Sequence, residues 1–289
     1  MHYEGHVIRP PSEAESLILQ VSVGCSHNAC SFCGTYRGVR FHPTASARIA
    51  ADLDWAATHH PHTRRVFLCD GDPTALPTDR LLWILASIRR RLPQVERIAC
   101  YASAHSVARK SDAELTELRA AGLRMAYLGL ESGDDAVLAT VNKGCDARTQ
   151  ITQARRLIDA GCKLSLTVLL GLGGRERWRE HASATGAAVS AIDPAHVAAL
   201  TLMPLPGTPL AEAIAEGRFA LPGPQEILAE LRELLAAIDL TRGLFLADHA
   251  SNYLPLRIRL PRHKADALAR IDAALAGALP LRPERWRGL

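Results

Sequence analysis

Three cysteines in one short stretch are the residues whose types and spacing point most clearly to chemistry. Cys25, Cys30 and Cys33 fall within nine residues. Thiolates this close in sequence can converge on one metal centre. A structural zinc ion takes four ligands, and His27 could supply the fourth. A [4Fe–4S] cluster held by three thiolates instead leaves one iron open to a substrate or cofactor, and we favour this interpretation.

The elements that must position these cysteines alternate between strand and helix. Short apolar runs are followed by amphipathic helical stretches from residue 16 to about residue 217. Parallel strands need such helical connections, so the pattern predicts an α/β fold with a parallel sheet, either doubly wound or closed toward a barrel. Long loops after the strands are typical of a barrel. The six expected strands are 17–23, 66–69, 98–102, 124–130, 163–170 and 197–203.

Local signals mark the ends of several helices. Ser111 and Glu114 form a capping box, which predicts that a helix begins there and ends at Gly122. We expect three regions in the chain: an N-terminal extension over 1–15, a partial barrel over 16–217 and a C-terminal helical cap over 218–289.

The cysteine stretch resembles that of the radical S-adenosylmethionine (SAM) superfamily. That family usually spaces its cysteines Cys-x3-Cys-x-aromatic-Cys, whereas this chain has Cys-x4-Cys-x-Phe-Cys, with Phe32 as the aromatic residue. Later motifs occur in the family's order, and Gly129-Leu-Glu-Ser-Gly133 is similar to a motif of oxygen-independent coproporphyrinogen oxidases. The resemblance implies a partial (β/α)6 TIM-like barrel that binds a [4Fe–4S] cluster and SAM.

The resemblance also implies roles for individual residues. Cys25, Cys30 and Cys33 would hold the cluster. Asp72, or less favourably Asp70, would receive the SAM ammonium group, although Asp-Gly is also a common turn. Glu131 would bond the ribose hydroxyls, Lys143 would meet the SAM carboxylate, and Gly171 would let the backbone approach the adenine. The other residues implied in SAM binding are Phe32, Gly71 and Ser132.

Outside these motifs, three polar residues on the predicted cap are substrate candidates. His249, Asn252 and Tyr253 lie in one short loop, and ordinary loop capping would explain them equally well. Cys69, Cys100 and Cys162 lie in or beside strands, and we expect them to be buried core thiols.

By this resemblance the chain is an oxygen-sensitive enzyme that cleaves SAM reductively and forms a 5′-deoxyadenosyl radical. A flavodoxin-like or ferredoxin-like protein would supply the electron. The 24 residues before Cys25 cannot hold a cobalamin domain, and no second cysteine cluster follows. A small-molecule substrate is therefore expected. The alternatives are transfer of a 3-amino-3-carboxypropyl group and a non-enzymatic iron–sulfur or zinc protein.

The composition limits which class of protein this is and where in the cell it is expected. The chain has 289 residues, of which 48% are hydrophobic and 22% charged, which excludes a mostly disordered chain. No apolar run reaches the roughly 18 residues that a membrane helix needs, and no signal peptide precedes the first strand. We therefore expect a cytoplasmic protein that does not bind membranes. The net charge is +4 without a long block of like charges, so nucleic acid is an unlikely partner.

Overall fold

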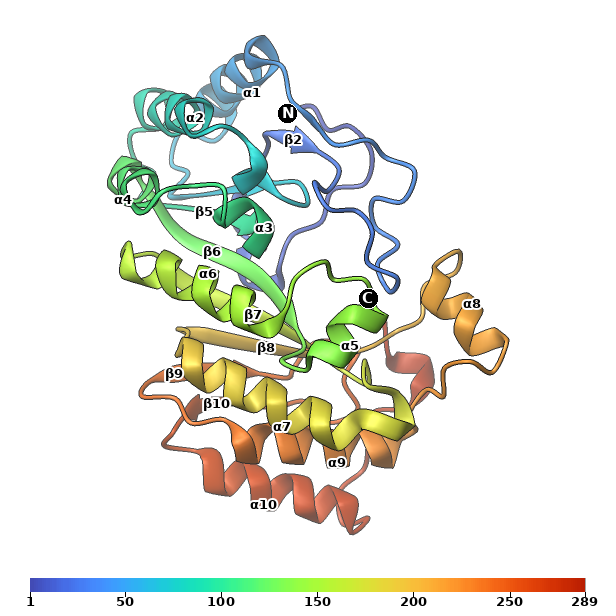
Figure 1. Cartoon of the computed structure of the whole chain (residues 1–289). Helices are drawn as coiled ribbons and strands as arrows, with labels where there is room; N and C mark the ends of the chain where they lie inside the picture. Colours follow the sequence, from blue (N-terminus) through green and yellow to red (C-terminus); the bar gives the residue numbers. More distant parts are fainter. Residues whose placement is uncertain (289) are drawn as a thin grey trace. The chain divides into compact units, whose positions relative to one another are not determined.

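The computed structural model describes residues 1–288, and these residues form two compact units. The first unit consists of residues 1–28, 35–128 and 153–164. The second consists of residues 29–34, 129–152 and everything described from residue 165 onward. Figure 1 shows the helices and strands of both units, coloured along the sequence.

The first unit is built on four parallel strands. Strands β1, β4, β5 and β6 pair in this order, with each strand parallel to the next. A short antiparallel pair, β2 and β3, lies beside the start of the cysteine stretch. The elements of this unit are η1 (Pro11–Glu13), β1 (Leu17–Gln20), β2 (Ser22–Val23), β3 (His42–Pro43), α1 (Ser46–His59), β4 (Arg65–Cys69), η2 (Pro73–Ala75), α2 (Thr78–Arg91), β5 (Arg97–Ala102), α3 (Ala104–Val107), α4 (Asp112–Ala121) and most of β6 (Leu123–Glu131).

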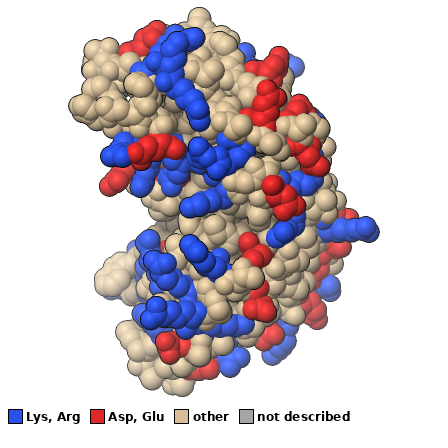
Figure 2. Space-filling view, turned by 90° about the vertical axis from the view of Figure 1, so that its left-hand side faces the viewer, with Lys and Arg blue, Asp and Glu red and all other residues tan. Residues whose placement is uncertain are grey.

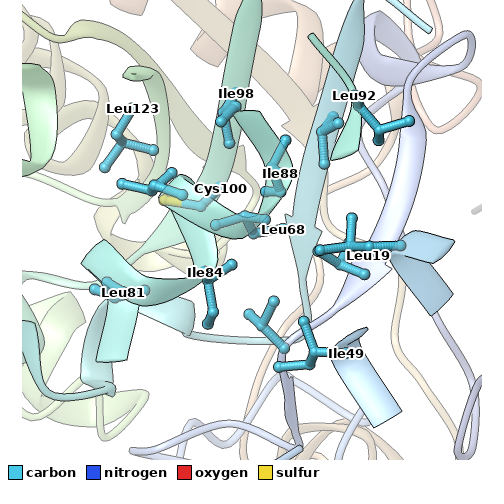
Figure 3. Close-up of a cluster of buried hydrophobic side chains, with 14 of the residues drawn as sticks. Leu19, Ile49, Leu68, Leu81, Ile84, Ile88, Leu92, Ile98, Cys100 and Leu123 are labelled. Carbon is cyan, nitrogen blue, oxygen red and sulfur yellow. The ribbon is translucent and has the colours of Figure 1, made fainter. Parts of the chain in front are cut away.

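The core of the first unit lies between these strands and the helices α1, α2 and α4. Helix α2 presents Leu81, Ile84, Leu85 and Ile88 at helical spacing, and all four side chains are buried. Figure 3 shows side chains of α2 beside those of the strands, among them Leu68 of β4. Burial of each such side chain contributes about 2 kcal/mol to the free energy of unfolding. This apolar layer therefore holds the strands and the helices of the first unit together.

The second unit repeats the pattern with three further parallel strands and one antiparallel strand. Strand β7 pairs with β8 and β8 with β9, all parallel, and β10 returns antiparallel to β9. Strand β6, helix α6 and strand β7 each have residues in both units. The elements are α5 (Asp135–Thr140), α6 (Ala147–Asp159), β7 (Lys163–Leu170), α7 (Gly174–Ile192), β8 (His196–Thr201), α8 (Pro209–Ala215), α9 (Pro224–Ala237), β9 (Gly243–Leu246), β10 (Arg257–Leu260), α10 (Lys264–Leu275) and η3 (Glu284–Trp286).

These observations confirm the expected α/β class with a parallel sheet. Each of the six predicted strands is present, with ends shifted by a few residues. The capping box of Ser111 and Glu114 is formed, and Gly122 follows the end of α4. Strands β9 and β10 were not expected, because residues 218–289 were predicted to be a helical cap. The boundaries of the three predicted regions stay predictions. Among residues 1–288, no helix is both long and apolar enough to span a bilayer.

Candidate functional site

The three cysteines of the predicted metal site lie in different units. Cys25 belongs to the first unit, whereas Cys30 and Cys33 belong to the second. All three are partly exposed, and no disulfide bond involves a described cysteine. Within residues 1–288, no group of three or more His, Cys, Asp or Glu side chains is arranged to hold a metal ion. The assignment of these cysteines as ligands therefore stays a prediction.

Three of the remaining thiols differ from these cysteines in burial, whereas Cys145 is partly exposed as they are. Cys69, Cys100 and Cys162 are buried in the first unit, which confirms that they are core thiols. Burial raises the pKa of Cys69 and Cys100 and raises that of Cys162 to about 11. Because the thiolate is the form that binds metals, these three are poor ligands near neutral pH. The donor chemistry therefore fits a cluster on the partly exposed cysteines.

The difference in burial and pKa between the cysteines predicts which of them an alkylating reagent labels. In protein prepared without metal, iodoacetamide at about pH 8 should modify Cys25, Cys30 and Cys33 while sparing Cys100 and Cys162, because alkylation requires an accessible thiolate. Peptide mass spectrometry of the folded protein would measure this pattern. Protein reconstituted with iron and sulfide should lose the labelling of Cys25, Cys30 and Cys33, whereas Cys145, which is also partly exposed, should stay labelled. Equal labelling of Cys100 would contradict the burial on which the pattern depends.

In the first unit, the turn after β4 supports the start of the cysteine stretch. The Asp70 carboxylate accepts hydrogen bonds from the Tyr36 hydroxyl at 2.5 Å, from Gln20 at 3.3 Å and from the Gly24 N–H at 3.2 Å. Burial raises the pKa of Asp70, and these hydrogen bonds oppose the rise. Asp70 thus has three hydrogen-bond partners, which fix its carboxylate beside the start of the cysteine stretch.

Gly71 brings the turn and the cysteine stretch into contact. Its N–H donates to the Gly24 carbonyl at 3.1 Å. A Cβ at this position would lie 2.9 Å from the Cys25 Cβ and 2.7 Å from the Tyr36 ring. Only glycine therefore allows this approach.

Asp72 is held by hydroxyl groups. It is fully buried and accepts hydrogen bonds from Ser26 at 2.5 Å, Ser103 at 2.7 Å and Thr74 at 2.7 Å, and also from Ser106. Ser26 follows Cys25 directly, so Asp72 is fixed beside the first cysteine. The three serines were not predicted, because they come from distant parts of the chain.

In the second unit, Glu131 and Lys143 form a pair near Cys30. The Lys143 ammonium lies 3.2 Å from Glu131 Oε1. Burial tends to lower the pKa of Lys143, but the negative charges of Glu131 and Cys30 and the hydrogen bond to Glu131 raise it above its ordinary value. Glu131 adopts φ +63°, a left-handed conformation that glutamate rarely takes. Such conformations gather at binding sites, so this supports a functional role for Glu131.

The segment with Cys30 and Cys33 is tied to the loops of the same unit. The Ser31 N–H donates to the Val141 carbonyl at 2.9 Å, and the Ser31 carbonyl accepts from the Leu210 N–H at 3.0 Å. Phe32 packs against a buried cluster that includes Val141 and Leu172. Phe32 is therefore an apolar anchor between its two cysteines.

Ser132 and Gly171 are the other predicted SAM-binding residues in the second unit. The Ser132 hydroxyl lies 2.8 Å from His181 Nδ1, and the Gly171 N–H donates to Glu230 at 2.8 Å. His181 and Glu230 are both buried and were not predicted from the sequence.

The three predicted substrate residues lie at the end of β8 but do not act as one group. Asn252 is buried and uses its amide on Thr201 and on the Ala199 carbonyl, both at 2.8 Å. The ring of His249 bonds to the neighbouring Ser251 at 2.9 Å. These contacts match ordinary loop capping, so a substrate role for either residue stays a prediction.

Tyr253 is different because it lines a small cavity. Its hydroxyl donates to Glu284 at 2.9 Å, and the Arg287 guanidinium lies 3.9 Å from the ring centre. Burial and the bond to Glu284 raise the pKa of Tyr253 to about 12. All three residues line a cavity of about 70 Å³ together with Met203 of the loop after β8. Glu284 and Arg287 lie near the chain's end, where no sequence motif marked them.

Comparison with a protein-family model establishes the family of the chain. The model of the radical SAM superfamily matches residues 19–183, which is more than half of the chain. The chain belongs to the radical SAM superfamily. Members of this superfamily are enzymes that use a [4Fe–4S] cluster and SAM. The matched range includes all three cysteines and every predicted SAM-binding residue.

Individual members of the superfamily resemble the chain over part of their length. The heme chaperone HemW of Bacillus subtilis (strain 168) is 26% identical over 182 residues, which is 62% of this chain and 47% of HemW. The coproporphyrinogen III oxidase HemN of Escherichia coli, described as a radical SAM enzyme, has a TM-score of 0.56 at 19% identity, over 76% of this chain and 51% of HemN.

The radical SAM methyltransferase TsrM of Kitasatospora setae, solved with tryptophan and a SAM analogue, has a TM-score of 0.62 at 18% identity. This match covers 83% of the chain and 54% of TsrM. The chain thus spans about half the length of these radical SAM proteins, and the structural similarities establish the fold alone.

Proposed function

We propose that the chain is a radical SAM enzyme that acts on a small molecule, with a [4Fe–4S] cluster on Cys25, Cys30 and Cys33. When bound and reduced, the cluster supplies the electron that cleaves SAM, giving a 5′-deoxyadenosyl radical that takes a hydrogen atom from the substrate. Family membership supports this proposal, and the contacts among the chain's own side chains supply the roles below.

The observation that carries the proposal is the Glu131–Lys143 pair beside Cys30. SAM has a ribose diol and a carboxylate, which need an acceptor and a cation. Glu131 supplies the acceptor and Lys143 the cation, 3.2 Å apart within one unit. The raised pKa of Lys143 keeps the ammonium charged at neutral pH. This pair can therefore exchange its mutual contact for contacts with SAM.

Asp72 is the candidate for the SAM ammonium group. Its carboxylate is fully buried, and hydroxyl donors hold it in one orientation. A carboxylate held by neutral donors can attract the cationic ammonium group of SAM. Asp70, which accepts hydrogen bonds from the Tyr36 hydroxyl and the Gly24 N–H, is the second candidate for this role.

The partners and the location of the protein are part of the proposal. A flavodoxin-like or ferredoxin-like protein is proposed as the reductant, because the cluster needs one electron for each cleavage. On the face drawn in Figure 2, basic side chains form several separate groups with uncharged surface and a few acidic side chains between them, rather than one continuous stripe. A cytoplasmic location stays a prediction.

The proposal predicts one product. Protein reconstituted anaerobically with iron and sulfide, reduced with dithionite and given SAM should form 5′-deoxyadenosine, which liquid chromatography with mass spectrometry would detect. Glu131→Gln should lower the yield about tenfold or more, because the amide binds the ribose diol less strongly than the carboxylate. Glu176→Gln, a substitution of the same type outside the predicted SAM-binding residues, is the matched control.

Other products would redirect the assignment. Methylthioadenosine would support transfer of a 3-amino-3-carboxypropyl group. Colourless protein with stoichiometric zinc would support the non-enzymatic alternative. The similarity to the heme chaperone HemW favours heme binding as a second candidate. Stoichiometric binding of hemin, seen as a shifted Soret band, without any cleavage of SAM would favour that candidate.

A further inference from the structure

Two buried hydrogen bonds and a close His–Glu contact join the loops that follow β6 and β7. Ser132, after β6, lies 2.8 Å from Nδ1 of His181 on α7. Nε2 of His181 lies 3.3 Å from Glu230 Oε1 on α9. The same Oε1 accepts the N–H of Gly171, after β7, at 2.8 Å. We call this series, Ser132–His181–Glu230–Gly171, the relay.

The polar side chains of the relay occupy buried positions that apolar side chains could fill equally well. Ser132 and Glu230 are 0% exposed and His181 is 2% exposed. Glu230 is the only charged side chain among the buried residues of α9. Its Oε2 has no hydrogen-bond partner within the described part of the chain. A buried carboxylate with an unpaired oxygen costs stability, so helix packing alone does not explain Glu230.

The hydrogen-bond roles fix the orientation of each member. His181 Nε2 also lies 3.0 Å from the Leu169 carbonyl. Because a carbonyl only accepts, Nε2 carries a hydrogen. The Ser132 hydroxyl is hydrogen-bonded to Nδ1, and its oxygen also accepts the Asp134 N–H at 2.9 Å. The imidazole is therefore held at both nitrogens.

We propose that His181 and Glu230 are positioning residues that set the loops 129–133 and 171–174 relative to each other for SAM binding. This inference rests on the proposed function, because those loops carry the predicted SAM-binding residues Glu131, Ser132 and Gly171. Neither His181 nor Glu230 is proposed to touch SAM.

The backbone of both loops explains why such positioning is needed. Gly171 has φ +87° and Glu131 has φ +63°, both in the left-handed region. A backbone in this region is held by its surroundings, particularly when the residue is not glycine. Glu230 fixes the Gly171 N–H directly, and His181 fixes Ser132 beside Glu131. A displacement of about 1 Å in a binding loop can cost about a hundredfold in rate.

Three variants of α9 test the coupling in the full-length protein. Glu230→Leu removes the acceptor, Glu230→Gln keeps an oxygen for the Gly171 N–H, and Leu231→Ala disturbs the same helix without touching the relay. Hydrogen exchange without SAM should become faster in Glu230→Leu at both 169–174 and 130–134. The second segment has no direct contact with Glu230 in the relay, so its change reports coupling through His181. The other two variants should leave 130–134 unchanged.

The same variants test whether the relay affects the binding of SAM. Calorimetry on reconstituted protein should show SAM binding weakened about tenfold in Glu230→Leu and by less than about threefold in Glu230→Gln. Leu231→Ala should lower the unfolding temperature, because it leaves a cavity, without weakening SAM binding. Thermal unfolding of all three variants separates lost stability from lost positioning.

Two results would overturn the relay: faster exchange confined to 169–174, or an equal effect of Glu230→Leu and Leu231→Ala on SAM binding. A failure of the proposed function has a different signature. Wild-type protein that neither binds nor cleaves SAM, with exchange still coupled between the two segments, would reject the function and leave the coupling intact.

Discussion

Replacing Cys33 with alanine is expected to abolish cluster binding. In the proposed site, three thiolates would hold a [4Fe–4S] cluster whose fourth iron is open, so loss of one would leave only two protein ligands. Iron in the anaerobically reconstituted protein should fall from about four atoms per chain to near zero. The brown colour, with its broad absorption near 400 nm, should disappear with it. Iron and sulfide analysis together with the absorption spectrum would measure both changes.

Two further variants test whether the loss of iron is specific to the proposed cluster ligands. Cys145→Ala removes another partly exposed thiol of the second unit and should retain full iron. His27→Ala separates the two metal hypotheses, because His27 is a ligand only in the Cys3His zinc site. The ring of His27 stacks on that of His105 with centroids 4.9 Å apart. Unchanged iron in Cys33→Ala would disprove this ligand, and loss of zinc in His27→Ala would support the zinc site.

Much of the fold could be predicted because its signals are local. The capping box at Ser111 and the glycine at 122 depend on residues a few positions apart, and both are formed. The alternation of apolar strands and amphipathic helices likewise needs only a short window. Strands β9 and β10 were missed because they follow each other without an intervening helix, outside the alternation of strand and helix that indicated the other short strands.

The predicted site was incomplete for a different reason. Motifs identified Asp72, Ser132 and Gly171, but the side chains that hold them come from distant positions. Ser103 lies 31 residues from Asp72, and Glu230 lies 59 residues from Gly171. Such partners depend on how the helices pack, and a single sequence without alignment does not show them. A buried acid on the apolar face of α9 is the one signal that could have marked Glu230.

The motif Gly129-Leu-Glu-Ser-Gly133 shows how one short sequence serves both packing and binding. Glu131 faces Lys143, and Ser132 is held by His181. Gly133 contributes to packing, because its backbone lies directly against helix α7. Its N–H donates to the Thr185 hydroxyl at 2.9 Å. Close approach of the motif to α7 therefore holds the two preceding side chains in place.

Gly133→Ala is accordingly expected to destabilise the second unit strongly. The added Cβ would lie 2.3 Å from the Ala184 carbonyl oxygen and 2.8 Å from the Thr185 Cα. Both are backbone atoms, so no side-chain rotation relieves the clash and the motif or α7 must move. We expect a loss of about 3 kcal/mol in the free energy of unfolding. Differential scanning calorimetry should show a midpoint lower by roughly 5 °C or more.

Two companion variants test the cause of this loss. Gly288→Ala adds the same methyl group where no atom lies within 4 Å, and it should leave the midpoint unchanged. Ala184→Gly in the Gly133→Ala background removes a side chain of α7 but leaves the carbonyl that causes the clash. The double variant should therefore remain at least as unstable as Gly133→Ala. A return to wild-type stability would instead show that side-chain crowding, rather than backbone contact, requires glycine at position 133.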